Sequence, residues 1–395
     1  QALTQAVEFY RAHDVVPALP EPLLLRARTA ARRGDAAAAL RDLDEGIAAV
    51  ERLGGRVAGS GVLHVERALF TDAVALALQR ENMAAAFAYA ERSRGGALTL
   101  AALQQRLAGS GTVVLELVTL PEEVVTFAVT ADEATVARRG RELPLYEQFV
   151  APVEHVLADA RRVIVVADEA LEQVAFAAIR DRRGQYLIER FEVAMATSAA
   201  SLQPRDGRPL RSAAAMALPS GENAQMAGLP ETEGELADVA AAYPAAERIP
   251  ATLAALRDAR ADVLHIAGHT AREQGAGNQA LVFGDGRVSW KTVTALAPLQ
   301  PRLVVLAACE TLRRPAAAET RALSLGAAVA AAGADEVVGT LAPIPDRHAR
   351  RLFGMFHRHL AAGASAAAAL RATQLEAIRS GEVPWKAVAL LTTSV

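Results

Sequence analysis

The chain has 395 residues, of which 52% are hydrophobic and only 4% aromatic, and its formal net charge is −3. This length is sufficient for two or three domains that bury their own cores. The small net charge excludes the broad positive field that attracts nucleic acids or anionic membranes, so we expect neither partner. No apolar run is long enough to span a membrane, and no signal peptide opens the chain. Because the first residue is Gln, we expect the sequence to be a fragment of a longer protein.

A single cysteine, Cys309, restricts the chemistry further. It excludes intramolecular disulfides and any zinc or iron–sulfur site built from several thiolates. We therefore expect no metal or other cofactor, and the reducing cytoplasm as the location. The basic residues are almost all Arg, with Lys only at Lys291 and Lys386, and Ala is abundant. This composition indicates a GC-rich bacterial genome.

Residues 1–107 have apolar residues at helical spacing on both sides of two short polar turns. The turns are Arg33-Gly34-Asp35 and Arg80-Glu81-Asn82. Two helix–turn–helix units with Ala-rich interiors resemble tetratricopeptide repeats, although most of the large aromatic positions are missing. An ordinary pair of helical hairpins is the alternative. Repeats of this kind need neighbours to cover their ends, and we expect a protein partner to bind them.

Residues 108–112 break the helical pattern, and strands alternate with helices from there to the C-terminus. The expected strands are 112–120, 124–131, 161–168, 191–198, 213–219, 262–269, 301–309, 334–343 and 385–394, with a hairpin around 284–286. The expected helices are 144–160, 231–243, 289–298, 319–333, 345–361 and 364–380. Continuous apolar strands alternating with helices predict a mostly parallel sheet that is covered by helices on both faces.

Two of these strands end in reactive side chains, His269 and Cys309. Sites in open α/β sheets form at the carboxyl ends of the strands, and the segment between the two strands is long enough for a parallel crossover. An imidazole close to a thiol can generate the thiolate that a free thiol lacks at neutral pH. His269 is then the general base and Cys309 the nucleophile. The backbone N–H groups of Thr270 and Cys309 are the candidate oxyanion donors.

Other interpretations of these residues remain open. A lone cysteine at the end of an apolar strand is often buried and inert. His265 lies in mid-strand and is expected in the core or behind the site, while His357 and His359 lie in a basic helix and are expected at the surface. A tyrosine-phosphatase loop would require Arg at the position of Pro315.

The segments "DVLHIAGH" and "LVVLAACET" resemble the CHAT family, caspase-like peptidases usually found behind tetratricopeptide repeats. The likeness extends over roughly residues 85–395, from "AYAERSRGGALTLAALQ" through "YLIERFEVAMATS" to "PWKAVALL". It implies a caspase-like α/β fold preceded by an all-α repeat segment, with His269 as the base and Cys309 as the nucleophile. The order of histidine before cysteine is that of caspases and separases. The same relatives imply repeats at 1–107, a non-catalytic half at 108–210 and a catalytic half at 211–395.

The sequence departs from the family pattern in three places. Thr270 replaces the Gly that usually follows the base, the segment after Cys309 lacks the usual glycines, and Ala342 replaces a common Trp. We expect a cysteine endopeptidase that cleaves a protein substrate, in a bacterial defence or cell-death system. A catalytically degenerate interaction or signalling module is the alternative, and a peptide or ubiquitin-like thiol transferase is a third. The polar stretches 219–231, 270–280 and 310–320 flank the site, so we expect weak activity until a partner on the repeats orders them.

Overall fold

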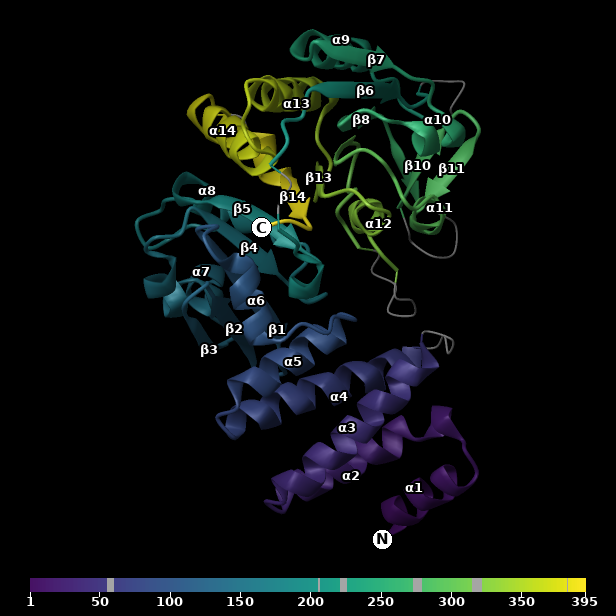
Figure 1. Cartoon of the computed structure of the whole chain (residues 1–395), viewed down its shortest axis with the longest axis vertical. Coiled ribbons are helices and arrows are strands. Elements are labelled where there is room, and N and C mark those ends of the chain that lie inside the picture. The colour runs from purple at the N-terminus through teal and green to yellow at the C-terminus, as the bar shows by residue number, and fades with distance from the viewer. Residues whose placement is uncertain (55–59, 205–206, 221–225, 273–278, 315–321, 382) are drawn as a thin grey trace.

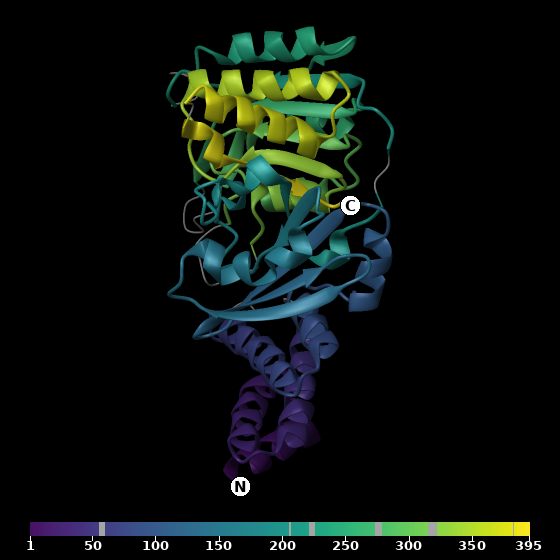
Figure 2. The ribbon, with the colours of Figure 1, turned by 90° about the vertical axis from the view of Figure 1, so that its left-hand side faces the viewer.

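The structure is a computed structural model and describes residues 1–54, 60–204, 207–220, 226–272, 279–314, 322–381 and 383–395. The N-terminal part forms a helical segment at one end of the molecule, and the remainder forms an α/β body around one large sheet (Figure 1). A second view shows the helical segment beneath the strands of the body (Figure 2).

The helical segment contains six α-helices among the described residues. They are α1 (Ala2–Ala12), α2 (Pro20–Arg32), α3 (Ala36–Leu53), α4 (Ser60–Gln79), α5 (Met83–Ser93) and α6 (Leu100–Leu107). Side chains of the two predicted turns start the second helix of each pair. Asp35 accepts from the N–H of Ala38 at 2.9 Å, and Asn82 accepts from the N–H of Ala85 at 3.0 Å. The helices pair as α2 with α3 and α4 with α5, so the hairpins are confirmed, while their tetratricopeptide character stays a prediction.

Buried polar contacts attach the helical segment to the body. The carboxylate of Glu91, which is fully buried, accepts from the N–H groups of Ala199 and Ala200 at 2.8 and 2.7 Å. One turn later, Arg94 donates to the carboxylate of Glu116 at 3.0 Å and to a strand carbonyl at 2.6 Å. Because buried charges are costly unless paired, these contacts hold α5 in one orientation on the body.

The large sheet has 11 strands in the order β3-β2-β1-β4-β5-β14-β13-β12-β8-β6-β7. In the first half these are β1 (Thr112–Thr119), β2 (Glu123–Val129), β3 (Ala134–Gly140), β4 (Arg162–Val166) and β5 (Glu192–Ala196). In the second half they are β6 (Ser212–Ala217), β7 (Ala245–Arg248), β8 (Val263–Ala267), β12 (Leu303–Ala307), β13 (Glu336–Thr340) and β14 (Val388–Thr392). Neighbours run parallel except in the pairs β3–β2, β2–β1 and β13–β14. The predicted mostly parallel sheet is therefore confirmed, with one reversal of direction at its centre.

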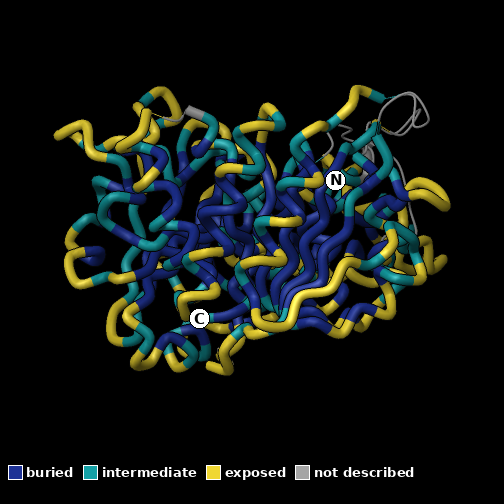
Figure 3. The backbone as a smooth tube through the Cα atoms, turned by 90° about the horizontal axis from the view of Figure 1, so that it is seen from above, coloured by how far each residue is buried: buried dark blue, intermediate teal, exposed yellow. Residues whose placement is uncertain are grey.

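Helices cover the second half of the sheet on both faces, and alternate strand residues enter two separate cores. One core contains Val263, Leu303 and Val305 beneath α9 (Thr232–Ala242), α13 (Asp346–Ala361) and α14 (Ala366–Arg379). The other contains Leu264, Ile266 and their β12 neighbours beneath α10 (Leu253–Asp258), α11 (Trp290–Ala295) and α12 (Leu325–Ala331). Seen from above, the strands form a buried centre within a partly exposed rim (Figure 3). Burial on both faces explains why these strands are apolar throughout.

The structure differs from the predicted elements at several points. The helix expected at 144–160 is split into α7 (Leu145–Phe149) and a 3-10 helix at Ala151–Leu157, because Pro152 cannot donate the hydrogen bond that would continue α7. The short strands β3, β7 and β9 (Thr270–Arg272) were not predicted. β9 joins β10 (Gln279–Phe283) and β11 (Gly286–Ser289) in a separate three-stranded sheet. Part of the helix expected at 319–333 lies outside the described residues, and α12 begins at Leu325.

Candidate active site

The register of the sheet brings His269 and Cys309 to the same end of two neighbouring strands. β8 and β12 pair in parallel, with Ala267 opposite Ala307. The N–H of Gly268 extends this ladder by donating to the carbonyl of Ala307 at 3.2 Å. Each reactive residue follows its paired alanine by two positions. The adjacency that the prediction required is therefore present in the structure.

Gly268 is required by the close approach of β6 to the strand end that carries His269. Its φ is +155°, and a Cβ at this position would lie 2.4 Å from the Cβ of Leu218. The N–H of Leu218 donates to the carbonyl of Ala267 at 2.8 Å, so the two chains are held together here. A side chain at position 268 would push the two strand ends apart and displace His269.

His269 is half-buried, and its Nε2 lies 2.8 Å from the carbonyl oxygen of Ala227. A carbonyl can only accept a hydrogen bond, so this contact places the proton of the neutral ring on Nε2. Nδ1 then carries the lone pair that a general base needs. Ala227 belongs to the stretch 219–231 that we expected to flank the site, of which residues 221–225 lie outside the described residues. No hydrogen bond between the His269 ring and the Cys309 thiol is recorded, although the structure describes both residues.

Thr270 connects the histidine strand to Cys309 by a hydrogen bond. Its hydroxyl donates to the carbonyl oxygen of Cys309 at 2.8 Å. The residue that departs from the family pattern therefore makes a direct contact with the Cys309 peptide. A glycine at this position could not form it. The assignment of the Thr270 N–H as an oxyanion donor stays a prediction.

Two threonines fix the turn around Cys309 from the other side. Thr340, at the end of β13, donates its hydroxyl to the carbonyl of Ala308 at 2.7 Å. Its N–H donates to the hydroxyl of Thr311 at 3.0 Å, and its carbonyl accepts from the N–H of Leu312 at 2.9 Å. Cys309 itself is half-buried. The thiol thus lies on a turn whose backbone is held on both sides.

Behind the site, four titratable side chains form a buried row under α9 and α13. The hydroxyl of Tyr243 is hydrogen-bonded to Nδ1 of His357 at 2.9 Å, and Nε2 of His357 lies 3.0 Å from Nδ1 of His265. Nε2 of His265 is 3.0 Å from a carboxylate oxygen of Glu235, outside the alignment of a hydrogen bond. Burial, and then the neighbouring His265, hold the pKa of His357 well below its usual value, so this ring is neutral. His265 lies in the core as expected, whereas the surface position expected for His357 is wrong because the apolar face of α13 carries it inward.

Ion pairs connect the segment after Cys309 to the first half of the sheet and to the helical segment. Arg314 donates to Glu169 at 2.8 Å and lies 3.4 Å from Glu172. Glu169 also pairs with Arg67 of α4. Burial raises the pKa of the Glu172 carboxyl, and the charge of Arg314 opposes that rise. A charged path therefore runs from α4 to a residue five positions beyond Cys309.

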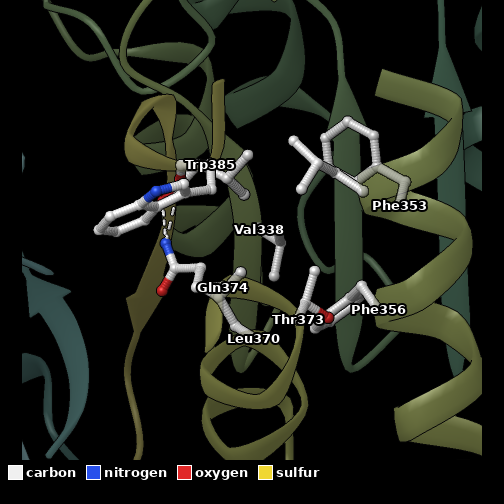
Figure 4. Close-up of a pocket in the computed structure, with 9 residues that line it drawn as sticks. Val338, Phe353, Phe356, Leu370, Thr373, Gln374 and Trp385 are labelled. Atoms are coloured by element: carbon white, nitrogen blue, oxygen red, sulfur yellow. Dashed lines mark hydrogen bonds between the residues drawn. The ribbon is translucent and has the colours of Figure 1, made fainter. Parts of the chain in front are cut away.

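A small pocket lies away from these residues, between the sheet and the pair α13–α14 (Figure 4). Its lining is mostly apolar and includes Phe353, Phe356 and Trp385. The amide of Gln374 donates across it to the carbonyls of Trp385 and Val388 at 3.2 and 2.9 Å. Neither His269 nor Cys309 lines it, so it is a packing gap in the core and not a substrate site.

In the described ranges, no three His, Cys, Asp or Glu side chains gather as metal ligands would. No described helix is both long and apolar enough to cross a membrane.

The order and direction of the strands define a caspase-like α/β fold preceded by helices, which confirms the predicted fold class. A chain of the Saccharomyces cerevisiae separase–securin complex at 2.6 Å has this fold, with a TM-score of 0.53 and 8% identity. The match covers 96% of this chain and 40% of the yeast chain. A second structure of that complex, at 3.0 Å, gives a TM-score of 0.52, 9% identity and coverages of 91% and 37%. The chain thus spans about two fifths of the length of these relatives, and at this identity the likeness concerns the fold alone.

A family model described as the CHAT domain matches residues 142–386, which is more than half of the chain. The chain therefore belongs to the CHAT family. No curated protein matches it. The family predicted from the residues around His269 and Cys309 is confirmed.

Proposed function

We propose that the protein is a cysteine endopeptidase in which His269 is the general base and Cys309 the nucleophile. The observation that carries this proposal is the register of β8 and β12, which aligns the two side chains at one end of the sheet. The contact of His269 with the Ala227 carbonyl supports it, because a protonated Nε2 leaves Nδ1 free to accept the thiol proton. The single cysteine and the Arg-rich composition support a bacterial cytoplasm as the setting.

The proposed chemistry is acyl transfer to the thiol followed by hydrolysis. Nδ1 of His269 takes the proton of Cys309, and the thiolate attacks the peptide carbonyl of a protein substrate. The backbone N–H groups of Cys309 and Thr270 are the proposed donors to the resulting oxyanion. The imidazolium then protonates the leaving amine, and a water molecule activated by the same ring releases the acyl group from the sulfur.

Labelling of the thiol by a peptidyl electrophile tests this proposal. We expect the wild-type chain to gain one adduct by intact-mass measurement and Cys309→Ala to gain none. Peptide turnover should fall to background in Cys309→Ala, because no second cysteine can replace it. Its thermal unfolding should be close to that of the wild type, since the thiol is half-buried at a strand end. Unchanged turnover in this variant would exclude the peptidase.

The second candidate is a catalytically degenerate module that binds or signals through the same fold. Two observations favour it: no hydrogen bond joins the imidazole to the thiol, and Thr270 stands where the family usually has Gly. A wild-type chain that stays unlabelled at Cys309 even with its repeat-bound partner present would support this candidate.

We also propose that the helical segment regulates the site through a bound protein partner. The charged path from Arg67 through Glu169 to Arg314 supports this, because it ends in the segment that follows the nucleophile. The fixed attachment of α5 through Glu91 would transmit a displacement of the helices to the first half of the sheet. A partner can shift the population toward the catalytically competent state only by as much as it binds that state more tightly than the incompetent one. Weak turnover is therefore expected from this chain alone.

A further inference from the structure

The residue after the nucleophile, Glu310, has a backbone conformation that L-residues with a Cβ disfavour. Its φ is +56°. Among the described residues, Asp14 and Glu81 also have positive φ, but each lies just beyond the end of a helix, where this conformation is common. Glu310 instead follows a strand end at the candidate site. Away from helix ends, such a conformation persists only where surrounding contacts hold it, and residues of this kind cluster at functional sites.

The side chain of Glu310 makes the contacts that hold it. Its Oε2 accepts from Nε2 of Gln279 at 2.8 Å, and its Oε1 pairs with Arg313. A second guanidinium, Arg272, lies 4.0 Å from Oε2. The Glu310 side chain is only 13% exposed. Because it is already paired and hydrogen-bonded, this carboxylate is a tether for its own backbone and not a free charge for a substrate.

The tether and the Thr270 contact come from neighbouring strands of one small sheet. Thr270 begins β9 and Gln279 begins β10, and these strands pair with Thr270 opposite Leu281 and Arg272 opposite Gln279. The Thr270 hydroxyl holds the carbonyl of Cys309, while the Gln279 amide holds the side chain of the next residue. Two contacts on successive residues fix the plane of the Cys309–Glu310 peptide. That plane sets the direction of the Cys309 carbonyl and restricts the backbone of the residue that carries the thiol.

We propose that Gln279 and Glu310 are positioning residues for the nucleophile, and that their hydrogen bond holds the left-handed turn that aims Cys309. This inference rests on the proposed function for its effect on catalysis. The tether itself does not depend on cleavage. The β9–β10 pair thereby becomes part of the working site, although it lies outside the large sheet.

Kinetics of three variants test the catalytic part. We expect Gln279→Ala to lower kcat about tenfold with KM nearly unchanged, since a lost hydrogen bond to a charged group corresponds to a change of roughly this size. Glu310→Gly keeps access to positive φ but loses the tether, and should show the same loss. Exchanging the partners in the double variant Gln279→Glu with Glu310→Gln restores a donor–acceptor pair and should recover most of kcat. Arg287→Ala is the matched control, because this residue of the same small sheet bonds the carbonyl of Arg272 and not the Cys309 turn.

A wild-type kcat in Gln279→Ala, or a double variant no faster than the single ones, would overturn the catalytic part. A crystal structure of Gln279→Ala decides the tether independently of turnover. We expect φ of residue 310 to leave the left-handed region, and an unchanged turn would overturn the tether. If the wild-type chain cleaves no peptide at all, the proposed function fails, while this structure still decides whether Gln279 holds the turn.

Discussion

The two halves of the large sheet end their strands in similar ways but use different side chains there. In the first half, Asp168 follows the end of β4 by two residues, just as His269 and Cys309 follow the ends of β8 and β12. Its carboxylate accepts from the N–H of Thr119 and from its hydroxyl at 3.0 Å, so it is occupied with the backbone of β1. In the second half, the strand ends carry an imidazole and a thiol on turns that other residues hold. The comparison shows that the sheet places residues at equivalent strand ends in both halves, while the chemical nature of each side chain determines what it can do there.

The two halves also bury polar groups differently. The first half buries the carboxyl of Glu116, which pairs with Arg94 of the helical segment, and burial raises the pKa of this carboxyl. The second half places a neutral histidine, His357, between Tyr243 and His265. A buried neutral ring such as His357 is sensitive to acid, because protonating it would bury a charge. We therefore expect the second half to be the more acid-sensitive of the two.

The largest expected effect distinguishes His269, at the end of its strand in the second half, from His265 in the interior of the same strand. His269→Ala should lower turnover by about 10²–10⁴-fold through loss of the general base, with little change in stability. His265→Ala should instead lower the free energy of unfolding by about 2–4 kcal/mol, because it leaves buried partners unsatisfied. Peptide kinetics and urea unfolding of both variants measure the two effects. A stable, inactive His265→Ala beside an active His269→Ala would reverse the assignment of the base.

The next effect concerns pH and the buried histidine row. The folded-state pKa of His357 is below its unfolded value, so below about pH 6.5 the unfolded chain binds a proton that the folded chain does not. The free energy of unfolding should therefore be constant with respect to this group above that pH. It should fall on acidification by up to about 1.4 kcal/mol per pH unit for one proton. His357→Gln removes the titrating ring and keeps a donor and an acceptor for Tyr243 and His265. Its urea midpoint should fall less between pH 7 and pH 5, and parallel curves for wild type and variant would contradict the role of this ring.

The smallest expected effect tests whether the first half influences turnover through its ion pairs with the segment that follows Cys309. Arg314→Ala removes the contacts with Glu169 and Glu172, and should lower turnover by about fivefold or less, since partly exposed ion pairs contribute about 1 kcal/mol at most. A double-mutant cycle with Glu169→Gln isolates the pair. High salt should reduce the difference. Strictly additive effects of the two substitutions would mean that the first half does not act on the Cys309 segment through this pair.

The amino-acid sequence by itself determined the elements whose signals are local. The helical hairpins were predictable because Asp35 and Asn82 start helices through contacts three residues away. The strands that end in His269 and Cys309 were predictable because burial on both faces requires continuous apolar runs. The family likeness added the order of base and nucleophile. None of these signals reports which strands are neighbours.

Only the tertiary structure decided the contacts that complete the site, because they join residues far apart in the chain. The pairing of β8 with β12, the Ala227 carbonyl on His269 and the Thr270 hydroxyl on Cys309 are all of this kind. The same reason explains the errors. His357 lies in a basic helix whose apolar face is recognised only once α13 is seen to pack on the sheet, and β9 is too short to have a periodicity of its own. Glu310 was invisible as a positioning residue, since neither its positive φ nor its bond to Gln279, 31 residues earlier, has a local signature.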